Sequence, residues 1–333
     1  MTSAPAIPLV FVELLADPQR RFAGLHWWHE DVSAAGLLPW LRDRSYLELA
    51  RDLPCLWDEG VVARWPEALR DALALAPTQT VPAGALWRAD SAFPAPLPPG
   101  ARWVTGPWHL QPPAATSAEV TTSRARALQL LQRVAQDADT HELEDIFRQD
   151  AVMSYQLLRV VNSVALGGGR TITSFTQAIL ILGREPLRRW LNLLLFSARD
   201  DDPRSHLLGA QVALRARGLE LLAQEAGFDR STQDQAFMAG MFSLLGVLFG
   251  QPLATVLAPL HIGDDLRQAL LEQRGDLGRL LSTWLAAEQG DAPGLRAGLA
   301  HWGVGAERFN TALLQACIWV CQLTREPGAP THG

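Results

Sequence analysis

The stretch from residue 145 to residue 196 constrains the fold of this chain most, because it carries the spacing of several short amphipathic helices. Toward its end, apolar residues recur at steps of three and four and therefore line one face of a helix, namely Leu187, Trp190, Leu191, Leu194, Leu195 and Ala198. Gly183 is suited to end the preceding helix, and Pro186 is suited to the first turn of the next. Ser174 and Gln177 form a capping box at another helix start. The stretch contains no residue set able to run a reaction, so it favours a helical interaction module over an enzyme.

The composition leaves room for one large or two medium domains, since the chain has 333 residues and is 48% hydrophobic. Residues 1–117 hold 9 arginines against 12 acidic residues, and the remainder holds 20 against 23. Both parts are therefore mildly acidic, which disfavours binding to a nucleic-acid backbone. All 29 basic residues are arginine, so any mechanism that needs a catalytic lysine is excluded.

The cysteines and the amino terminus predict a cytoplasmic protein. Three cysteines, Cys55, Cys317 and Cys321, are too few and too oddly numbered for a disulfide framework. The amino terminus lacks a positively charged segment before its apolar residues, and no apolar run approaches the roughly 18 residues that a membrane span needs. We therefore expect no membrane association.

A change in composition near residue 117 predicts a domain boundary. Fifteen of the 22 prolines and eight of the 12 tryptophans precede it, whereas helical periodicity is nearly continuous after it. We expect a first region over residues 1–117, a helical domain over 118–326 and a disordered tail over 327–333.

The first region has few clear elements of secondary structure. Its pattern predicts strands over residues 9–15 and 103–110, with a turn at 16–18 after the first strand. It predicts helices around residues 33–52 and 62–76.

The second region resembles HDOD domains, which are all-helical bacterial signalling modules similar to HD-type metal phosphohydrolases but without their metal site. The motifs that carry the resemblance are residues 149–154, 157–163, 172–174 and 178–183, followed by Leu187 and Arg188. Further motifs, at residues 214–217, 220–223, 236–245 and 286–291, resemble the subgroup in which an HDOD domain follows an EAL domain. The resemblance covers roughly residues 118–325 and implies a role in signal transduction.

The resemblance also implies that a metal site has been lost. Where HD hydrolases have a histidine and an aspartate that hold a divalent ion, the matching stretch from Gly240 to Gly246 has Ser243 and Leu244. Leucine has no lone pair to offer, and a neutral serine is a weak metal ligand. We therefore expect neither a catalytic residue, nor a bound metal, nor a cofactor.

The first region resembles EAL domains, which hydrolyse or bind cyclic di-GMP. Residues 12–15 resemble their first strand, and residues 106–113 resemble their closing strand. Only about 100 residues separate the two motifs, although a (β/α)₈ barrel takes about 250. The fold class predicted is thus mainly α, with the helical domain preceded by a small α+β remnant of an EAL-type barrel. Glu13 matches one former metal ligand, and we interpret it as a strand-end carboxylate in solvent, because a single carboxylate cannot hold magnesium.

Two other residue pairs raise the question of a metal site. His26 and His29 would share a face on a helix, but no third ligand follows at a known spacing, so a surface or packing role is favoured. Cys317 and Cys321 are four residues apart on a predicted terminal helix, and we interpret them as small buried residues in the absence of a second cysteine pair.

Six residues are candidates for contact with a partner protein: Arg159, Asn162, Ser163, Trp27, Trp28 and Trp108. Tryptophan is enriched at the centres of interfaces, but packing of these side chains against the helical domain is the favoured interpretation. Asn162 and Ser163 have a simpler role available, which is to close a helix end and hold the glycine-rich loop that follows.

These observations predict a non-catalytic signalling protein whose partners are other signalling proteins or a second copy of itself. An alternative is a sensor that binds a cyclic dinucleotide without cleaving it, for which Arg20, Arg21 or Arg102 can stack on guanine. A remote alternative is a metal-dependent phosphohydrolase with an unfamiliar ligand set.

Overall fold

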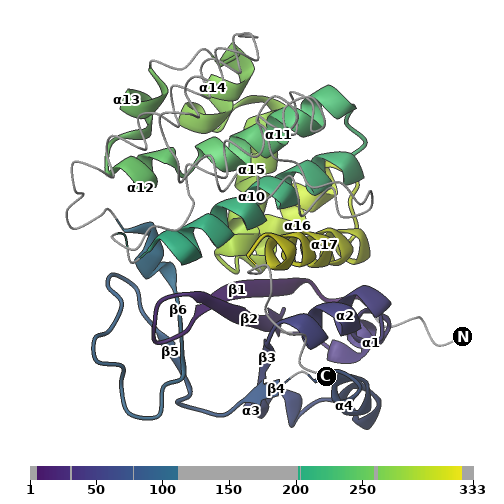
Figure 1. Cartoon of the computed structure of the whole chain (residues 1–333). Coiled ribbons are helices and arrows are strands. Elements are labelled where there is room, and N and C mark those ends of the chain that lie inside the picture. Colours follow the sequence, from purple (N-terminus) through teal and green to yellow (C-terminus); the bar gives the residue numbers. More distant parts are fainter. Residues whose placement is uncertain are drawn as a thin grey trace, which may run out of the picture. The chain divides into compact units, whose positions relative to one another are not determined.

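The computed structural model describes residues 6–30, 32–77, 79–111, 202, 204–258 and 262–324 (Figure 1). The chain divides into two compact units. The first consists of Met1–Gln111, His206–Leu244 and Asp264–Gly333, and the second of Pro112–Ser205 and Leu245–Gly263. The first unit thus combines both ends of the chain, and the boundary predicted at residue 117 stays a prediction.

A six-stranded sheet forms the amino-terminal part of the first unit. Its strands, in spatial order, are β4 (Gln79–Val81), β3 (Cys55–Asp58), β2 (Phe22–His29), β1 (Val10–Ala16), β6 (Trp103–Thr105) and β5 (Leu86–Arg88). β1 is antiparallel to both of its neighbours, whereas the other neighbouring pairs are parallel. The central strand therefore runs against the rest of the sheet.

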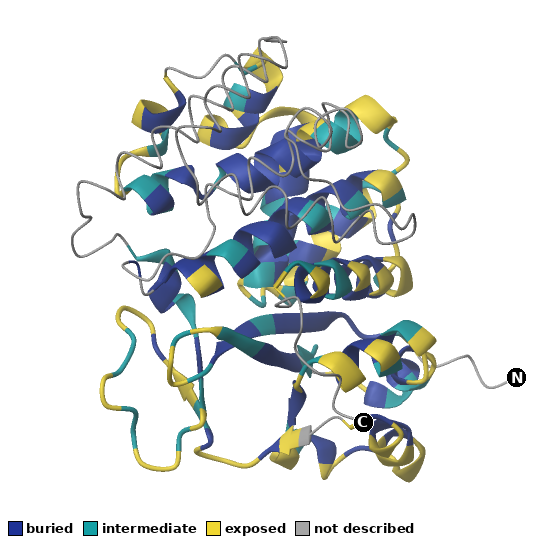
Figure 2. Ribbon diagram, in the orientation of Figure 1, coloured by how far each residue is buried: buried dark blue, intermediate teal, exposed yellow. Residues whose placement is uncertain are grey.

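The strand predicted over residues 9–15 is confirmed as β1, and the turn after it is confirmed as well. The carboxylate of Asp17 accepts the backbone N–H of Arg21 at 2.8 Å, which closes the turn into β2. Successive side chains of a strand point to opposite faces, so Trp27 and Trp28 of β2 face opposite ways. Both strands are buried along most of their length (Figure 2).

Short helices join the parallel strands of the sheet. They are η1 (Ala34–Leu37), α1 (Leu38–Leu41), α2 (Arg44–Asp52), α3 (Glu59–Val62) and α4 (Glu67–Ala74). The Asp43 carboxylate caps α2 by accepting the N–H of Ser45 at 2.8 Å. Helices are thus present in both predicted ranges. The strand predicted over residues 103–110 is only partly right, because Gly106 has a φ of 94° and the chain continues as the 3₁₀ helix η2 (Pro107–Leu110).

The prediction of a small α+β remnant is wrong, since the amino-terminal part is a substantial sheet of six strands. Only β1 and β6 were predicted as strands from the sequence, and the eight-residue β2 was missed. β3, β4 and β5 have three or four residues each, which is too short for an alternating pattern to stand out. Strands in parallel pairs also lack that alternation when both of their faces are covered.

Aromatic side chains fill the space between the sheet and its helices. They are Trp27, Trp40, Tyr46, Trp57 and Trp65, and each is at most 8% exposed. Trp57 donates its indole N–H to the hydroxyl of Tyr46 at 2.9 Å, so this pair is satisfied without water. The tryptophans that crowd the first region in sequence are therefore mostly its core.

The described residues of the first unit from 206 to 244 and from 264 to 324 are mostly helical (Figure 1). The helices are α10 (Ser205–Glu225), of which all but Ser205 lies in this unit, α11 (Arg230–Phe242), α14 (Asp264–Glu272), α15 (Gly275–Glu288), α16 (Ala292–His301) and α17 (Ala306–Thr324). Asp229 and Asp291 cap α11 and α16. The ring of Trp284 lies against Gly218, which lets α10 and α15 approach closely. Within the described ranges, no helix has the length and apolar character needed to cross a bilayer.

The described part of the second unit is small. It contains α12 (Leu245–Phe249), α13 (Leu253–Leu257) and a buried ion pair in which Arg204 contacts Asp202 at 2.9 Å. Arg204 also donates to the carbonyl of Val247 at 3.4 Å, which holds the segment before α10 against α12.

Candidate functional site

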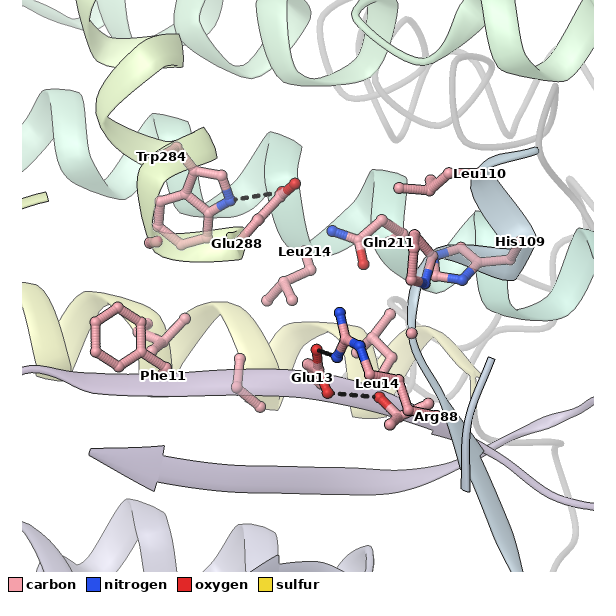
Figure 3. Close-up of a pocket in the computed structure, with 16 residues that line it drawn as sticks. Phe11, Glu13, Leu14, Arg88, His109, Leu110, Gln211, Leu214, Trp284 and Glu288 are labelled. Carbon is pink, nitrogen blue, oxygen red and sulfur yellow. Dashed lines mark hydrogen bonds and ion pairs between the residues drawn. The ribbon is translucent and has the colours of Figure 1, made fainter. Parts of the chain in front are cut away.

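A cavity of about 100 Å³ lies beside β1 in the first unit (Figure 3). Strands β1, β5 and β6, the helix η2, and helices α10, α15 and α17 all contribute side chains to its wall. Its polar lining residues include Glu13, Arg88, Gln211 and Glu288. This is where polar groups from both ends of the chain converge.

The carboxylate of Glu13 forms one side of the cavity, and each of its two oxygens accepts a hydrogen bond from a neighbouring strand. Arg88 of β5 donates to one carboxylate oxygen at 2.5 Å, and the Thr105 hydroxyl of β6 donates to the other at 2.8 Å. The hydrogen bond and the negative charge of Glu13 raise the pKa of Arg88 above its ordinary value. A guanidinium therefore neutralises the charge of Glu13.

This arrangement corrects the interpretation of Glu13 as a strand-end carboxylate in solvent. Glu13 lies in the middle of β1, opposite His26 of β2, and its side chain is 21% exposed. Strands β5 and β6 place Arg88 and Thr105 beside Glu13 in the sheet. No local sequence pattern predicts this contact.

The carboxylate of Glu288 in α15 forms the opposite side of the cavity. Arg215 of α10 grips both of its oxygens, at 2.9 and 2.5 Å, and the indole N–H of Trp284 donates to it at 3.0 Å. The side chains of Arg215 and Glu288 are only 6% and 15% exposed. Arg215 and Glu288 therefore form a bidentate, largely buried ion pair.

Ser243, at the carboxyl-terminal cap of α11, belongs to the same network. Its hydroxyl accepts a hydrogen bond from Arg215 at 2.9 Å and donates one to the carbonyl of Gly240 at 2.7 Å. Leu244, the next residue, is 4% exposed and belongs to the core. The two positions predicted to have lost metal ligands therefore hold one residue bonded to an arginine and one residue in apolar packing.

The other predicted interaction residues are placed as follows. Trp27 is fully buried and Trp108 is 3% exposed, so neither lies on the surface. Trp28 is partly exposed and stacks on Phe11, with ring centroids 5.6 Å apart. Arg159, Asn162 and Ser163 lie outside the described residues.

The two histidines considered as a metal pair lie on a strand, and their spacing of three turns them to opposite faces. His26 lies 3.3 Å from the carboxylate of Asp58, and His29 accepts the indole N–H of Trp65 at 3.2 Å. A shared metal site is thereby ruled out for this pair.

The prediction that Cys317 and Cys321 are small buried residues of a terminal helix is confirmed. Burial raises the pKa of Cys317 well above its ordinary value and that of Cys55 to about 12, so these thiols stay protonated at neutral pH. In the part of the chain that the structure describes, no three His, Cys, Asp or Glu side chains are grouped so that they could hold a metal ion.

Sequence reasoning named Glu13 and Ser243 but missed the other polar groups that make the site. Arg215 and Glu288 fall inside motifs that resemble the family, but they are 73 positions apart. No sequence motif marked Arg88 or Gln211 as a functional residue. Only the packing of α10 on α15, and of β5 beside β6, brings these groups to one cavity.

Part of the chain is similar to a known protein family and to two known proteins. The HDOD domain family matches residues 121–255. A Vibrio cholerae protein named cyclic di-GMP phosphodiesterase CdgJ is 30% identical over 207 residues, which are 62% of this chain and 48% of that protein. An uncharacterized Bacillus subtilis protein, YuxH, is 30% identical over 139 residues, which are 41% of this chain and 34% of that protein.

The matched parts span about half of the first relative and about a third of the second. No solved structure matches the chain. Of the matched range, the structure describes residue 202 and residues 204–255, which include α10, α11 and α12. The chain therefore contains an HDOD domain, and residues 121–255 are the part that matches the family.

Proposed function

We propose that this chain is a signalling protein that acts without catalysis, by binding another protein, in a process linked to cyclic di-GMP. The HDOD domain and the similarity to a protein named as a cyclic di-GMP phosphodiesterase support a signalling role. The matched part makes up 48% of that relative.

One observation carries the non-catalytic part of the proposal. The family resemblances place former metal ligands at three positions, and an arginine binds the polar side chain at two of them, while Leu244 packs in the apolar core. Arg88 pairs with Glu13, and Arg215 binds Ser243. A guanidinium neutralises a carboxylate but cannot activate a water molecule as a divalent ion does. A site rebuilt in this way is suited to holding helices and strands together.

We also propose that the amino-terminal sheet is a degenerate EAL-type domain. Described residues of the two motifs that resemble EAL domains line the same cavity, and β6, which directly precedes the second motif, pairs with β1. The chain's complete lack of lysine is consistent with a domain that has lost its catalytic groups.

The catalytic question is tested by incubating the purified full chain with cyclic di-GMP and either magnesium or manganese. We expect no linear dinucleotide, while CdgJ under the same conditions serves as the positive control. Product that grows with protein concentration and is abolished in Glu13→Gln would refute the non-catalytic proposal.

The binding part is tested by capturing partners from the native cell with tagged protein. A specific partner retained by the wild type and lost in Arg159→Ala or in the double variant Asn162→Ala, Ser163→Ala supports the proposal. Arg274→Ala is the matched control, because the Arg274 side chain is 74% exposed. Equal recovery by all of the variants would place the binding surface elsewhere.

The sensor alternative rests on the arginines suited to stack on guanine. Arg21 and Arg102 are exposed, whereas Arg20 already lies 5.1 Å over the ring of Phe93. The cavity of about 100 Å³ is smaller than the roughly 300–1,000 Å³ typical of pockets for larger ligands. Calorimetry with micromolar cyclic di-GMP distinguishes the two functions, since neither heat nor a thermal shift is expected from a protein that binds only proteins. Elemental analysis for stoichiometric metal tests the remote phosphohydrolase alternative.

A further inference from the structure

Gln211 is a buried amide that projects into the cavity without a hydrogen-bonding partner. It lies on α10 and is 9% exposed. In Figure 3 its carboxamide points into the space bordered by Leu214, Glu288 and Arg88. Within the described ranges, its side chain makes no hydrogen bond to another residue. Because this carboxamide faces the cavity, a molecule held there is the partner to which it can bond.

Each glutamate of the cavity wall is paired with an arginine, and Arg88 also lies 3.3 Å from Asp90, which is not part of that wall. Arg88 neutralises Glu13, and Arg215 neutralises Glu288. An added carboxylate would meet the two glutamates, and an added ammonium group would meet Arg88. The electrostatics therefore favour a neutral guest.

The amide of Gln211 sets the chemistry of that guest. It presents one carbonyl acceptor and one N–H donor side by side. A second amide edge, with its own carbonyl and N–H, matches this pattern with two parallel hydrogen bonds. Arg88 lies at the open side, where its side chain is 56% exposed, and its guanidinium offers a further donor to a carbonyl.

The size and the apolar walls limit the guest to a small molecule. Leu214, Trp284 and Leu313 supply apolar surface. An engineered cavity of about 150 Å³ holds benzene, so a cavity of about 100 Å³ suits a molecule of about four non-hydrogen atoms.

We propose that this cavity binds a small neutral molecule with adjacent carbonyl and N–H groups, of the amide, urea or lactam class. Gln211 is its principal recognition residue. The cavity wall joins sheet and helices within one unit, so the bound molecule strengthens the packing of β1 on α10 and α15. This inference does not rest on the proposed signalling function.

The test is a ligand-observed NMR titration of the full chain with acetamide, in which saturation transfer measures binding. We expect saturable binding to the wild type and about tenfold weaker binding to Gln211→Leu, because the amide edge that forms both hydrogen bonds to the guest is lost. Gln224→Leu is the matched control on the same helix, since Gln224 is exposed. It is expected to bind acetamide as the wild type does.

Two further measurements keep the proposal falsifiable. Leu214→Phe narrows the cavity while retaining Gln211, and it is expected to abolish the acetamide signal. Acetate and methylammonium are expected to bind more weakly than acetamide. Absence of a saturable acetamide signal with the wild type, a signal unchanged in Gln211→Leu, or acetate binding as tight as acetamide would each overturn the proposal.

Discussion

The carboxamide of Asn310 in α17 completes the hydrogen bonding of the backbone at Val10, where β1 begins. The amide oxygen accepts the Val10 N–H at 3.0 Å, and the amide nitrogen donates to the carbonyl of Pro8 at 2.8 Å. The backbone carbonyl of Asn310 in turn accepts the indole N–H of Trp40 at 3.3 Å. A residue near the carboxyl end of the chain thus acts as a strand partner for the first strand and buttresses the aromatic core.

Replacement of Asn310 by alanine is predicted to destabilise the first unit strongly. Asn310 is 1% exposed, so its loss leaves a buried N–H and a buried carbonyl without partners, at a cost of about 2–4 kcal/mol in the free energy of unfolding. Urea unfolding followed by tryptophan fluorescence measures the change. Thr311→Ala is the control, because Thr311 is exposed on the same helix, and it is expected to change stability little. Equal midpoints for the two variants would contradict the role assigned to Asn310.

Breaking the ion pair between Arg215 and Glu288 from one side is predicted to be costly. Both side chains are largely buried, so Arg215→Met leaves an uncompensated carboxylate, and a loss of about 3–5 kcal/mol is expected. The double variant Arg215→Met, Glu288→Leu removes both charges and is expected to recover part of that loss. Thermal unfolding of both single variants and the double variant closes the cycle. Additive losses would show that the two side chains are not coupled.

Removal of the Ser243 hydroxyl tests whether that residue serves the arginine network. Ser243→Ala deletes one acceptor for Arg215, and a loss of about 1–2 kcal/mol is expected, smaller than that of Arg215→Met. The same unfolding assay measures it. An unchanged stability would mean that Arg215 is held by Glu288 alone.

The contact between Glu30 and Arg296 is predicted to stabilise the folded protein at neutral pH and to lose that effect in acid. The hydrogen bond from Arg296 lowers the pKa of Glu30 below its ordinary value. The folded state therefore binds the proton more weakly than the unfolded chain, so the contribution is present above the ordinary glutamate pKa and is lost as pH falls through the lowered pKa.

Melting temperatures of the wild type and Glu30→Gln, measured from neutral pH down to about pH 3, test this expectation. The gap between the two proteins should close with acid. Because the Arg296 side chain is 47% exposed, the gap is expected to be small and to shrink in high salt. A gap that stays constant with pH would contradict the assignment.

The buried thiols are predicted to resist alkylation in the native state. Burial raises the pKa of Cys55 to about 12, and the thiolate is the reactive form. Iodoacetamide at neutral pH should therefore label none of the three cysteines quickly, and all three in urea. Mass spectrometry counts the adducts, and rapid labelling of Cys55 in the native protein would show that its pocket opens.

The resemblance to HDOD domains could be recognised from the sequence because it rests on local patterns. Motifs around Leu157 and Gly183 repeat the spacing of helical faces and their caps, and the family match over residues 121–255 confirms an HDOD domain. The first strand was likewise predicted from a local pattern, and the burial of the α17 cysteines was predicted from the absence of a second cysteine pair. Helical periodicity and capping depend on residues a few positions apart, so they are readable without knowing the fold.

The sheet and the polar site were decided only by the tertiary structure. β4 and β5 are too short to show a pattern, and they are recognisable only beside the neighbours that supply their hydrogen bonds. Glu13 meets Arg88, Arg215 meets Glu288, and Val10 meets Asn310 across 75, 73 and 300 positions of sequence. A charged or amide side chain needs a hydrogen-bonding partner when it is buried. Which distant residue becomes that partner depends on how the strands and helices pack, and a local sequence pattern does not contain that information.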